Sequence, residues 1–105
     1  SCTWTKLTNG FTPTQFSQNA LDIDTSGNLY AGSDLEASQY TANTWLPPFT
    51  LTPPITGFVK GLHWSPIGPN ASSSALYLGE FQAQSATESS VYVCNLTTYG
   101  CSILY

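Results

Sequence analysis

The residues from Asp22 to Asn28 have the oxygen-rich spacing of a cation-binding loop. They read Asp22-x-Asp24-x-Ser26-Gly27-Asn28, with oxygen-bearing side chains at alternate positions before a tight glycine turn. Calcium loops use such spacing to wrap the chain around a hard cation, but they close with a glutamate that is missing here. Asp22, Asp24 and Asn28 are the candidate calcium ligands. The alternative is a β-turn in which Asp24 accepts hydrogen bonds from its own backbone.

Acid–base and nucleophilic chemistry have few candidates in this sequence. His63 is the single histidine, and no motif such as Gly-x-Ser-x-Gly ties a serine or a cysteine to it. Two carboxylates are enough for glycoside hydrolysis, but the six acidic residues are scattered and single out no pair. We therefore expect a protein without catalytic residues, and a hydrolase is the alternative.

Aromatic side chains are candidates for a sugar-binding platform. Their faces pack against the C–H groups of sugars, while amide and carboxyl groups complete the hydrogen bonds. The candidate ligand-binding residues are Trp45, Tyr40, His63, Trp64 and Asp34. The alternative is that the aromatics fill the core, and it is strongest for Trp64 because this residue alternates with polar neighbours in a strand.

The three cysteines predict one disulfide and no zinc site. The chain has no Cys-x-x-Cys motif and a single histidine, whereas zinc sites need four clustered ligands. Cys94 and Cys101 are separated by a short hairpin that brings them near each other, which favours this pair. A Cys2–Cys94 bond is the alternative, in which the N-terminal segment closes the last strand unit.

Composition and charge exclude several classes of partner. With 105 residues the chain is long enough for one small domain. Only Lys6 and Lys60 are basic and the net charge is −4, which disfavours nucleic acid and anionic membrane surfaces. No apolar run approaches the roughly 20 residues of a membrane span. The chain starts at Ser1 without a methionine, which is typical of a mature secreted protein after signal removal or of an excised piece of a longer chain.

An internal repeat defines the elements that position these residues. Residues 20–24 (Ala-Leu-Asp-Ile-Asp) align with residues 61–65 (Gly-Leu-His-Trp-Ser) at an offset of 41. Residues 28–32 (Asn-Leu-Tyr-Ala-Gly) align with residues 75–79 (Ala-Leu-Tyr-Leu-Gly) at an offset of 47. The second copy therefore carries an inserted loop, and we expect any functional difference between the copies to lie in this loop and in the neighbouring His63 and Trp64.

Each copy predicts four short strands, because apolar and polar residues alternate as in a half-buried strand. The expected strands are residues 19–24, 28–33, 37–42 and 44–46, and then 59–65, 75–82, 89–94 and 100–104. Gly27 and Asn28 predict a tight turn, and the pairs Pro47-Pro48 and Pro53-Pro54 predict a linker between the copies.

The predicted fold class is all-β, with two tandem four-stranded antiparallel β-meanders, and a small β-sandwich is the alternative. The predicted boundaries are a single domain over residues 1–105, repeat one at about 14–50, repeat two at about 55–105, and residues 2–7 as an extra strand of the fourth type.

The run from Ala20 to Ala31 resembles the inner two strands of an NHL- or BNR-type β-propeller blade. Such repeats read apolar-x-apolar-Asp-x-x-Gly-Asn-apolar-Tyr-apolar, and this run follows the pattern. The second copy keeps about half of it and has Ser-Pro-Ile-Gly-Pro-Asn at the turn. The resemblance implies a blade-like fold and no particular activity, because propellers host many functions.

Two blades cannot close a ring, because propellers have about four to eight. Three arrangements stay open: a homo-oligomer (a dimer, or a trimer that resembles small two-blade lectins), a piece of a longer propeller, or a self-contained sandwich. We predict a secreted, non-catalytic recognition module that binds a glycan or a partner protein. The alternative is a secreted effector or structural domain that acts through self-assembly or strand-edge association.

Overall fold

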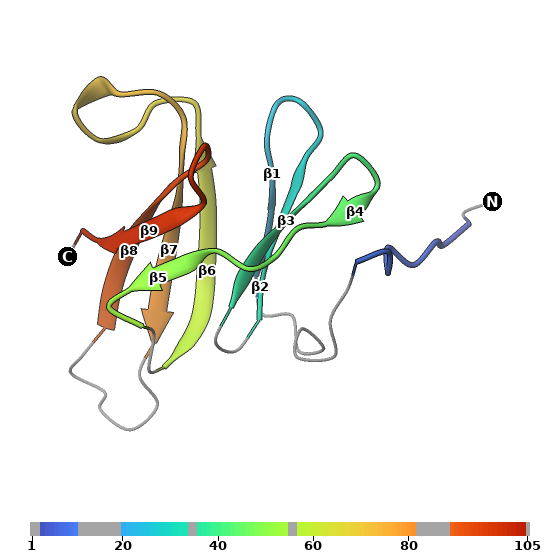
Figure 1. Cartoon of the computed structure of the whole chain (residues 1–105), viewed down its shortest axis with the longest axis horizontal. Helices are drawn as coiled ribbons and strands as arrows, with labels where there is room; N and C mark the ends of the chain where they lie inside the picture. Colours follow the sequence, from blue (N-terminus) through green and yellow to red (C-terminus); the bar gives the residue numbers. More distant parts are fainter. Residues whose placement is uncertain (1–2, 11–19, 34–35, 55–56, 82–88, 105) are drawn as a thin grey trace.

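The computed structural model describes residues 3–10, 20–33, 36–54, 57–81 and 89–104, and this part of the chain is all-β (Figure 1). The first sheet is antiparallel, with four strands in sequence order: β1 (Ala20–Ile23), β2 (Leu29–Gly32), β3 (Ala37–Thr41) and β4 (Thr44–Trp45). The second sheet is mixed, in the order β5-β9-β8-β7-β6: β5 (Thr50–Thr52), β6 (Phe58–Ser65), β7 (Ala75–Phe81), β8 (Ser89–Asn95) and β9 (Gly100–Ile103). A short 3-10 helix, η2 (Pro69–Ala71), lies between β6 and β7. Within these ranges no helix has the length and apolar character needed to cross a membrane.

The predicted all-β class is confirmed. Each of the eight expected strands is present, and its bounds agree with the prediction to within one residue. The four strands of each repeat pair in sequence order as one antiparallel meander. The sheets pack against each other through one face each, as expected for the small β-sandwich alternative.

The linker between the repeats contains a ninth strand that the sequence prediction missed. β5 lies between the two proline pairs and runs parallel to β9, with Leu51 opposite Cys101. The prolines bound this strand, because a proline cannot donate a ladder hydrogen bond. Thr50, Leu51 and Thr52 keep their N–H groups, and Leu51 packs against the core. The linker therefore covers the outer edge of β9.

The prediction of a fourth-type strand at residues 2–7 is wrong for the residues that are described. Residues 3–8 form no strand, and Trp4 is 93% exposed. Instead the Asn9 carbonyl accepts the backbone N–H of Trp45 at 2.9 Å, so the segment before β1 lies beside β4. β5, the segment before β6, lies beside β9 in the same way. The place expected for an extra strand next to β8 is already taken by β9.

The core lies between the two sheets. The first sheet contributes Tyr30 and Ala37, each 1% exposed. The second sheet and the linker contribute Phe49, Val59, Leu76, Leu78, Tyr92, Cys94 and Cys101. Burial of one large apolar side chain stabilises a fold by roughly 1.5–3 kcal/mol, so this cluster fixes how the sheets face each other.

Each sheet has an inner face, which packs against the other sheet, and an outer face. Side chains alternate between the two faces along a strand. Asp22 and Tyr30 are directly opposite in the ladder, so both lie on the inner face of the first sheet. Leu21 and Ile23 lie on its outer face. At the sheet edges, the backbone N–H of Trp64 donates to Asp22 Oδ2 at 2.6 Å and joins β6 to β1.

Substitution of Gly32 by valine is expected to lower the free energy of unfolding by about 1–3 kcal/mol, the usual result of overpacking a core. A Cβ atom at Gly32 would lie 2.6 Å from Val59 Cγ1, and Val59 is fully buried. Gly79, the aligned glycine of the second repeat, has only one atom near its Cβ position, at 4.0 Å. Urea unfolding of Gly32→Val and of the matched Gly79→Val tests this. Equal losses in both variants would contradict the close approach at Gly32.

Candidate functional site

Asp24 is the hydrogen-bond centre of the turn between β1 and β2. Its Oδ1 accepts the backbone N–H groups of Ser26 at 2.9 Å and Asn28 at 3.0 Å. Its Oδ2 accepts Asn28 Nδ2 and the Tyr30 hydroxyl, both at 2.9 Å. Burial raises the pKa of Asp24, but these hydrogen bonds, led by the Asn28 side chain, outweigh burial and bring the pKa below 3.8. Gly27 has φ +88°, the backbone conformation that the tight turn requires.

This network favours the β-turn interpretation of the motif over calcium binding. Both carboxylate oxygens of Asp24 are engaged, and Asn28 Oδ1 accepts the Thr41 hydroxyl at 2.6 Å. Asp22 points toward β6 instead of toward Asp24, since it accepts the N–H of Trp64. In the described ranges no three His, Cys, Asp or Glu residues gather closely enough to hold a metal ion.

His63 and Asp22 form a weak pair on the surface. His63 Nδ1 lies 3.8 Å from Asp22 Oδ2, and the histidine side chain is 75% exposed. This distance is too long for a hydrogen bond, so Asp22 does not orient the imidazole as a catalytic carboxylate would. Asp22 instead accepts the backbone N–H groups of Ile23 and Trp64. Asp22 thus joins β1 to β6 through the backbone of Trp64.

Tyr40 and Trp45 meet at the outer strands of the first sheet. They are opposite each other in the β3–β4 ladder, and their rings form an edge-on contact with centroids 5.1 Å apart. Trp45 Nε1 donates to the Leu7 carbonyl at 2.7 Å, which fixes the indole ring. Both rings are half-buried. The structure thus brings two of the five predicted ligand-binding residues together.

The other predicted ligand-binding residues lie apart from this pair. His63 and Trp64 are neighbours on β6, but they point to opposite faces because side chains alternate along a strand. Trp64 packs against the core cluster, as the alternative interpretation expected. Asp34 lies outside the described residues.

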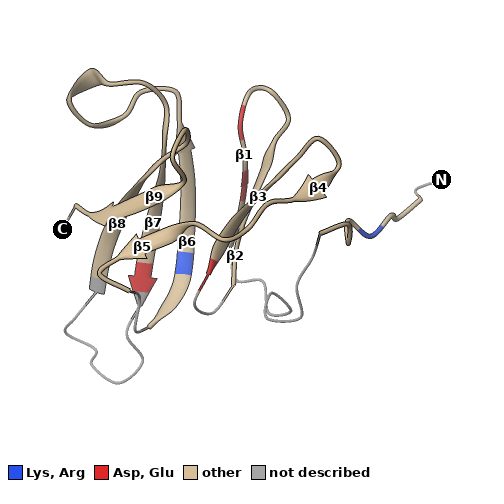
Figure 2. Ribbon diagram, in the orientation of Figure 1, with Lys and Arg blue, Asp and Glu red and all other residues tan. Residues whose placement is uncertain are grey.

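A cavity of about 320 Å³ lies under the loop between β6 and β7, on the outer face of the second sheet. This volume is at the lower end of the range for small-molecule sites. Its lining residues are Pro69, Ser72, Ser73, Ser74, Ala75, Val93, Cys94, Asn95, Gly100 and Ser102. The lining offers four hydroxyl groups and one side-chain amide beside apolar groups, and none of the lining residues is charged. In the second sheet, Figure 2 shows charged residues on β6 and β7 and none on the described parts of β8 and β9.

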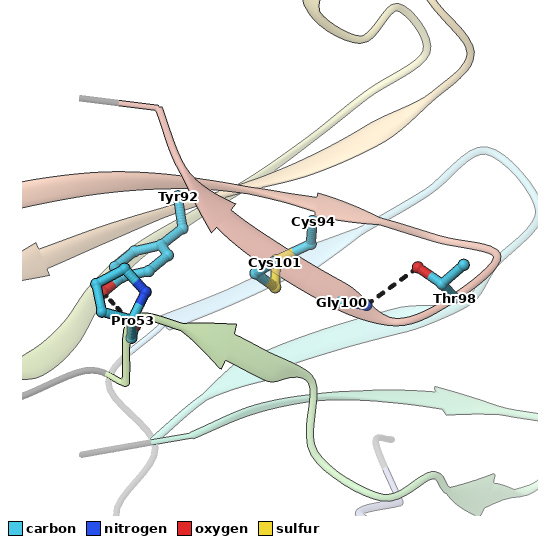
Figure 3. The surroundings of a disulfide bond; sticks show 6 residues. All are labelled: Pro53, Tyr92, Cys94, Thr98, Gly100 and Cys101. Atoms are coloured by element: carbon cyan, nitrogen blue, oxygen red, sulfur yellow. Dashed lines mark hydrogen bonds between the residues drawn. A yellow bond between two sulfur atoms is a disulfide. The ribbon is translucent and has the colours of Figure 1, made fainter.

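Short-range bonds hold the walls of this cavity. In the loop, the Gly68 N–H donates to the Ser72 carbonyl at 2.9 Å and the Ser72 N–H donates to the Pro69 carbonyl at 3.2 Å. Behind the strands of the opposite wall, on the inner face of the sheet, the Cys94–Cys101 disulfide joins directly paired residues of β8 and β9 (Figure 3). This confirms the favoured cysteine pairing, and a disulfide indicates an oxidising environment.

The sequence singled out the inserted loop, which lines the cavity, but missed the strand residues of the cavity. Ser72, Ser73 and Ser74 lie in or beside the extra residues of the second copy, which is the signal that pointed there. Val93 and Ser102 come from β8 and β9, whose approach to the loop depends on the sheet as a whole. A run of serines carries no information about such distant neighbours.

Function on this fold has to be inferred from the site, because one fold hosts many activities. The cavity is uncharged and lined by four serines, one asparagine and several apolar residues. Comparison of the chain with models of protein families, with curated proteins and with solved structures finds no significant match in any of the three.

Proposed function

We propose that the protein is a secreted, non-catalytic recognition module that binds a neutral carbohydrate in the cavity between the β6–β7 loop and strands β8 and β9. The uncharged, hydroxyl-lined cavity of about 320 Å³ is the observation that carries this proposal. The disulfide supports an extracellular location, where such bonds persist.

The chemistry of the lining fits a sugar better than an ionic ligand. Serine hydroxyls donate and accept hydrogen bonds, as sugar hydroxyls do, so each partner can adapt to the other. Pro69, Ala75 and Val93 supply an apolar patch for the C–H groups of a sugar ring. A phosphate or a carboxylate would need Arg, Lys or a helix N-terminus, and the lining has no basic residue.

The hydrogen bonds of Asp22 and Asp24 favour recognition over hydrolysis. Glycosidases use two carboxyl groups that face the scissile bond. Asp22 and Asp24 instead accept backbone and side-chain hydrogen bonds within the protein. The proposal therefore assigns no bond-breaking step.

Removal of three cavity hydroxyls is expected to weaken sugar binding by about 10- to 2,000-fold, since each net hydrogen bond contributes about 0.5–1.5 kcal/mol. The variant is Ser73→Ala/Ser74→Ala/Ser102→Ala, and Ser26→Ala, in the β1–β2 turn, is the matched control. A glycan array identifies the sugar, and titration calorimetry then compares affinities.

Trp45→Ala separates this site from the aromatic pair in the same experiment. The cavity assignment expects this variant to bind like the wild type. Loss of binding in Trp45→Ala with normal binding in the triple serine variant would place the sugar at Tyr40 and Trp45. A wild-type protein that binds no glycan would contradict carbohydrate recognition altogether.

A further inference from the structure

Leu21 and Ile23 form an exposed apolar pair on the outer face of β1. They are 68% and 56% exposed, although both belong to a strand whose inner side chain, Asp22, holds the neighbouring sheet. β1 is the edge strand of the first sheet. Single exposed apolar residues are ordinary on protein surfaces. The internal repeat gives this pair a more specific meaning.

The second repeat shows what covers the same position. Leu21 and Ile23 align with Leu62 and Trp64. Those two residues are partly buried and pack against the core cluster. Their strand, β6, lies against β1 and β2 of the first sheet. The first sheet therefore covers Leu62 and Trp64 of the second repeat. The aligned residues of the first repeat, Leu21 and Ile23, stay exposed.

On the other face of each repeat the difference in burial is reversed: the residues of the first repeat are the more deeply buried ones. Tyr30 and Ala37, on the inner face of the first sheet, are each 1% exposed because the second sheet covers them. Alignment and ladder register make Tyr77 and Val91 their counterparts. Both counterparts lie on the outer face of the second sheet and are only half-buried. The covering face of the second repeat is thus less buried, among the described residues, than the same face of the first.

The aligned glycines give the same result at the level of single atoms. Gly32 accommodates the Val59 side chain of the other sheet, since a Cβ atom there would lie 2.6 Å from it. Gly79 faces open space, with its nearest atom, the Gly61 nitrogen, at 4.0 Å from a Cβ position. The backbone of the second repeat therefore has room for an approaching strand that the described residues of this chain do not supply.

We propose that a second copy of the chain docks head to tail on the first. The outer face of the second sheet of one copy, with Tyr77, Gly79 and Val91, covers Leu21 and Ile23 of the next. This contact repeats the packing of the two sheets within one chain. Because the two faces are not equivalent, the interface is heterologous, and each docked pair keeps one free face of each kind. Repetition closes a ring or extends a chain, according to the rotation between copies.

Two variants separate the two faces of this interface. Leu21→Thr/Ile23→Thr removes the apolar pair and keeps β-branched residues in β1. Gly79→Val fills the open space on the other face, where the monomer itself has room. Circular dichroism and urea unfolding verify that both variants are folded. Val93, which lines the carbohydrate cavity, is unchanged in both, so sugar binding and association are measured separately.

Light scattering of the wild type is expected to give a concentration-dependent mass above the 11.3 kDa of one chain. Each variant alone is expected to be monomeric, and an equimolar mixture is expected to form a one-to-one complex, because each variant keeps the face that the other has lost. A wild type that stays monomeric at millimolar concentration overturns the proposal. Association of Gly79→Val alone, with a monomeric Leu21→Thr/Ile23→Thr, overturns the head-to-tail geometry in favour of a symmetric contact.

Discussion

Replacement of both Cys94 and Cys101 by alanine is expected to lower the free energy of unfolding by about 3 kcal/mol. The bond closes a short loop, with a sequence separation of seven residues. Loss of this cross-link returns about 2.5 kcal/mol of chain entropy to the unfolded state. The two sulfur atoms are also buried, at 0% and 4% exposure, so their removal leaves a small cavity that adds to the loss.

The disulfide also fixes β9 against β8 where the core meets the linker. Leu51 of β5 is opposite Cys101, and the hydroxyl of Tyr92 donates to the Pro53 carbonyl at 2.8 Å (Figure 3). We therefore expect the double variant to exchange amide protons faster in β5 and β9 than in β6 and β7. Sugar binding is also expected to weaken, because the disulfide holds together β8 and β9, which supply Val93 and Ser102 to the cavity.

Urea unfolding with and without a thiol reductant measures the effect without mutation. The reduced wild type is expected to unfold at a urea concentration slightly above that of the double alanine variant, because it loses the cross-link but keeps both sulfur atoms. Reductant is expected to leave the alanine variant unchanged. Cys2→Ser is the control, because it removes the alternative Cys2–Cys94 bond. Loss of stability in Cys2→Ser that matches the double variant would contradict the Cys94–Cys101 assignment.

Strand positions were predictable because their signals are local. Alternation at Leu21, Ile23, Leu62 and Trp64 set the period, and the Gly27 turn set the first hairpin. Each of these features involves residues within a few positions of one another. The structure therefore agrees with the predicted strand bounds.

The strand and site residues that escaped prediction depend on partners far along the chain. β5 has three residues and pairs with β9, which begins at Gly100, so no local pattern marks it. The cavity is likewise lined by residues far apart in the sequence, Ser73 of the loop, Val93 of β8 and Ser102 of β9. The sequence also assigned Asp22 and Asp24 to one cation site. The structure separates them, because alternate contacts turn Asp22 toward β6 and Asp24 toward its own turn.

The repeat itself was visible in the sequence, but the face each copy presents to the other was not. Alignment pairs Leu21 with Leu62, and two equivalent residues invite the assumption of equivalent surroundings. The sheets pack instead through non-equivalent faces, so one residue is exposed and the other packs against the core. Only the register of the ladders reveals this asymmetry, from which the proposed head-to-tail contact follows.

Substitution of Asp24 by alanine is expected to lower the free energy of unfolding by about 3 kcal/mol at neutral pH. Hydrogen bonds to a charged group contribute about 1.5–3 kcal/mol each, and losses within one network are not additive. The variant leaves the Asn28 N–H and the Tyr30 hydroxyl without their acceptor. Tyr30 is 1% exposed and also accepts Gln39 Nε2 at 3.0 Å, so the loss reaches the core.

The same network makes stability depend on acid. The folded-state pKa of Asp24 lies below its ordinary 3.8, so the stabilisation is fully present above pH 4 and is lost as pH falls through the folded-state pKa. Burial, followed by the hydrogen bond to Asp24, raises the pKa of Tyr30 above its ordinary 10, which keeps the hydroxyl a donor throughout this range.

Urea unfolding of the wild type and of Asp24→Asn between neutral pH and pH 2 tests this dependence. The asparagine keeps one acceptor oxygen and has no titrating group, so we expect it to be less stable than the wild type at neutral pH. We also expect it to lose less stability on acidification, so that the two curves converge toward pH 2. Parallel curves over the whole range would show that Asp24 does not carry the acid sensitivity, and would place that sensitivity on other carboxylates of the chain.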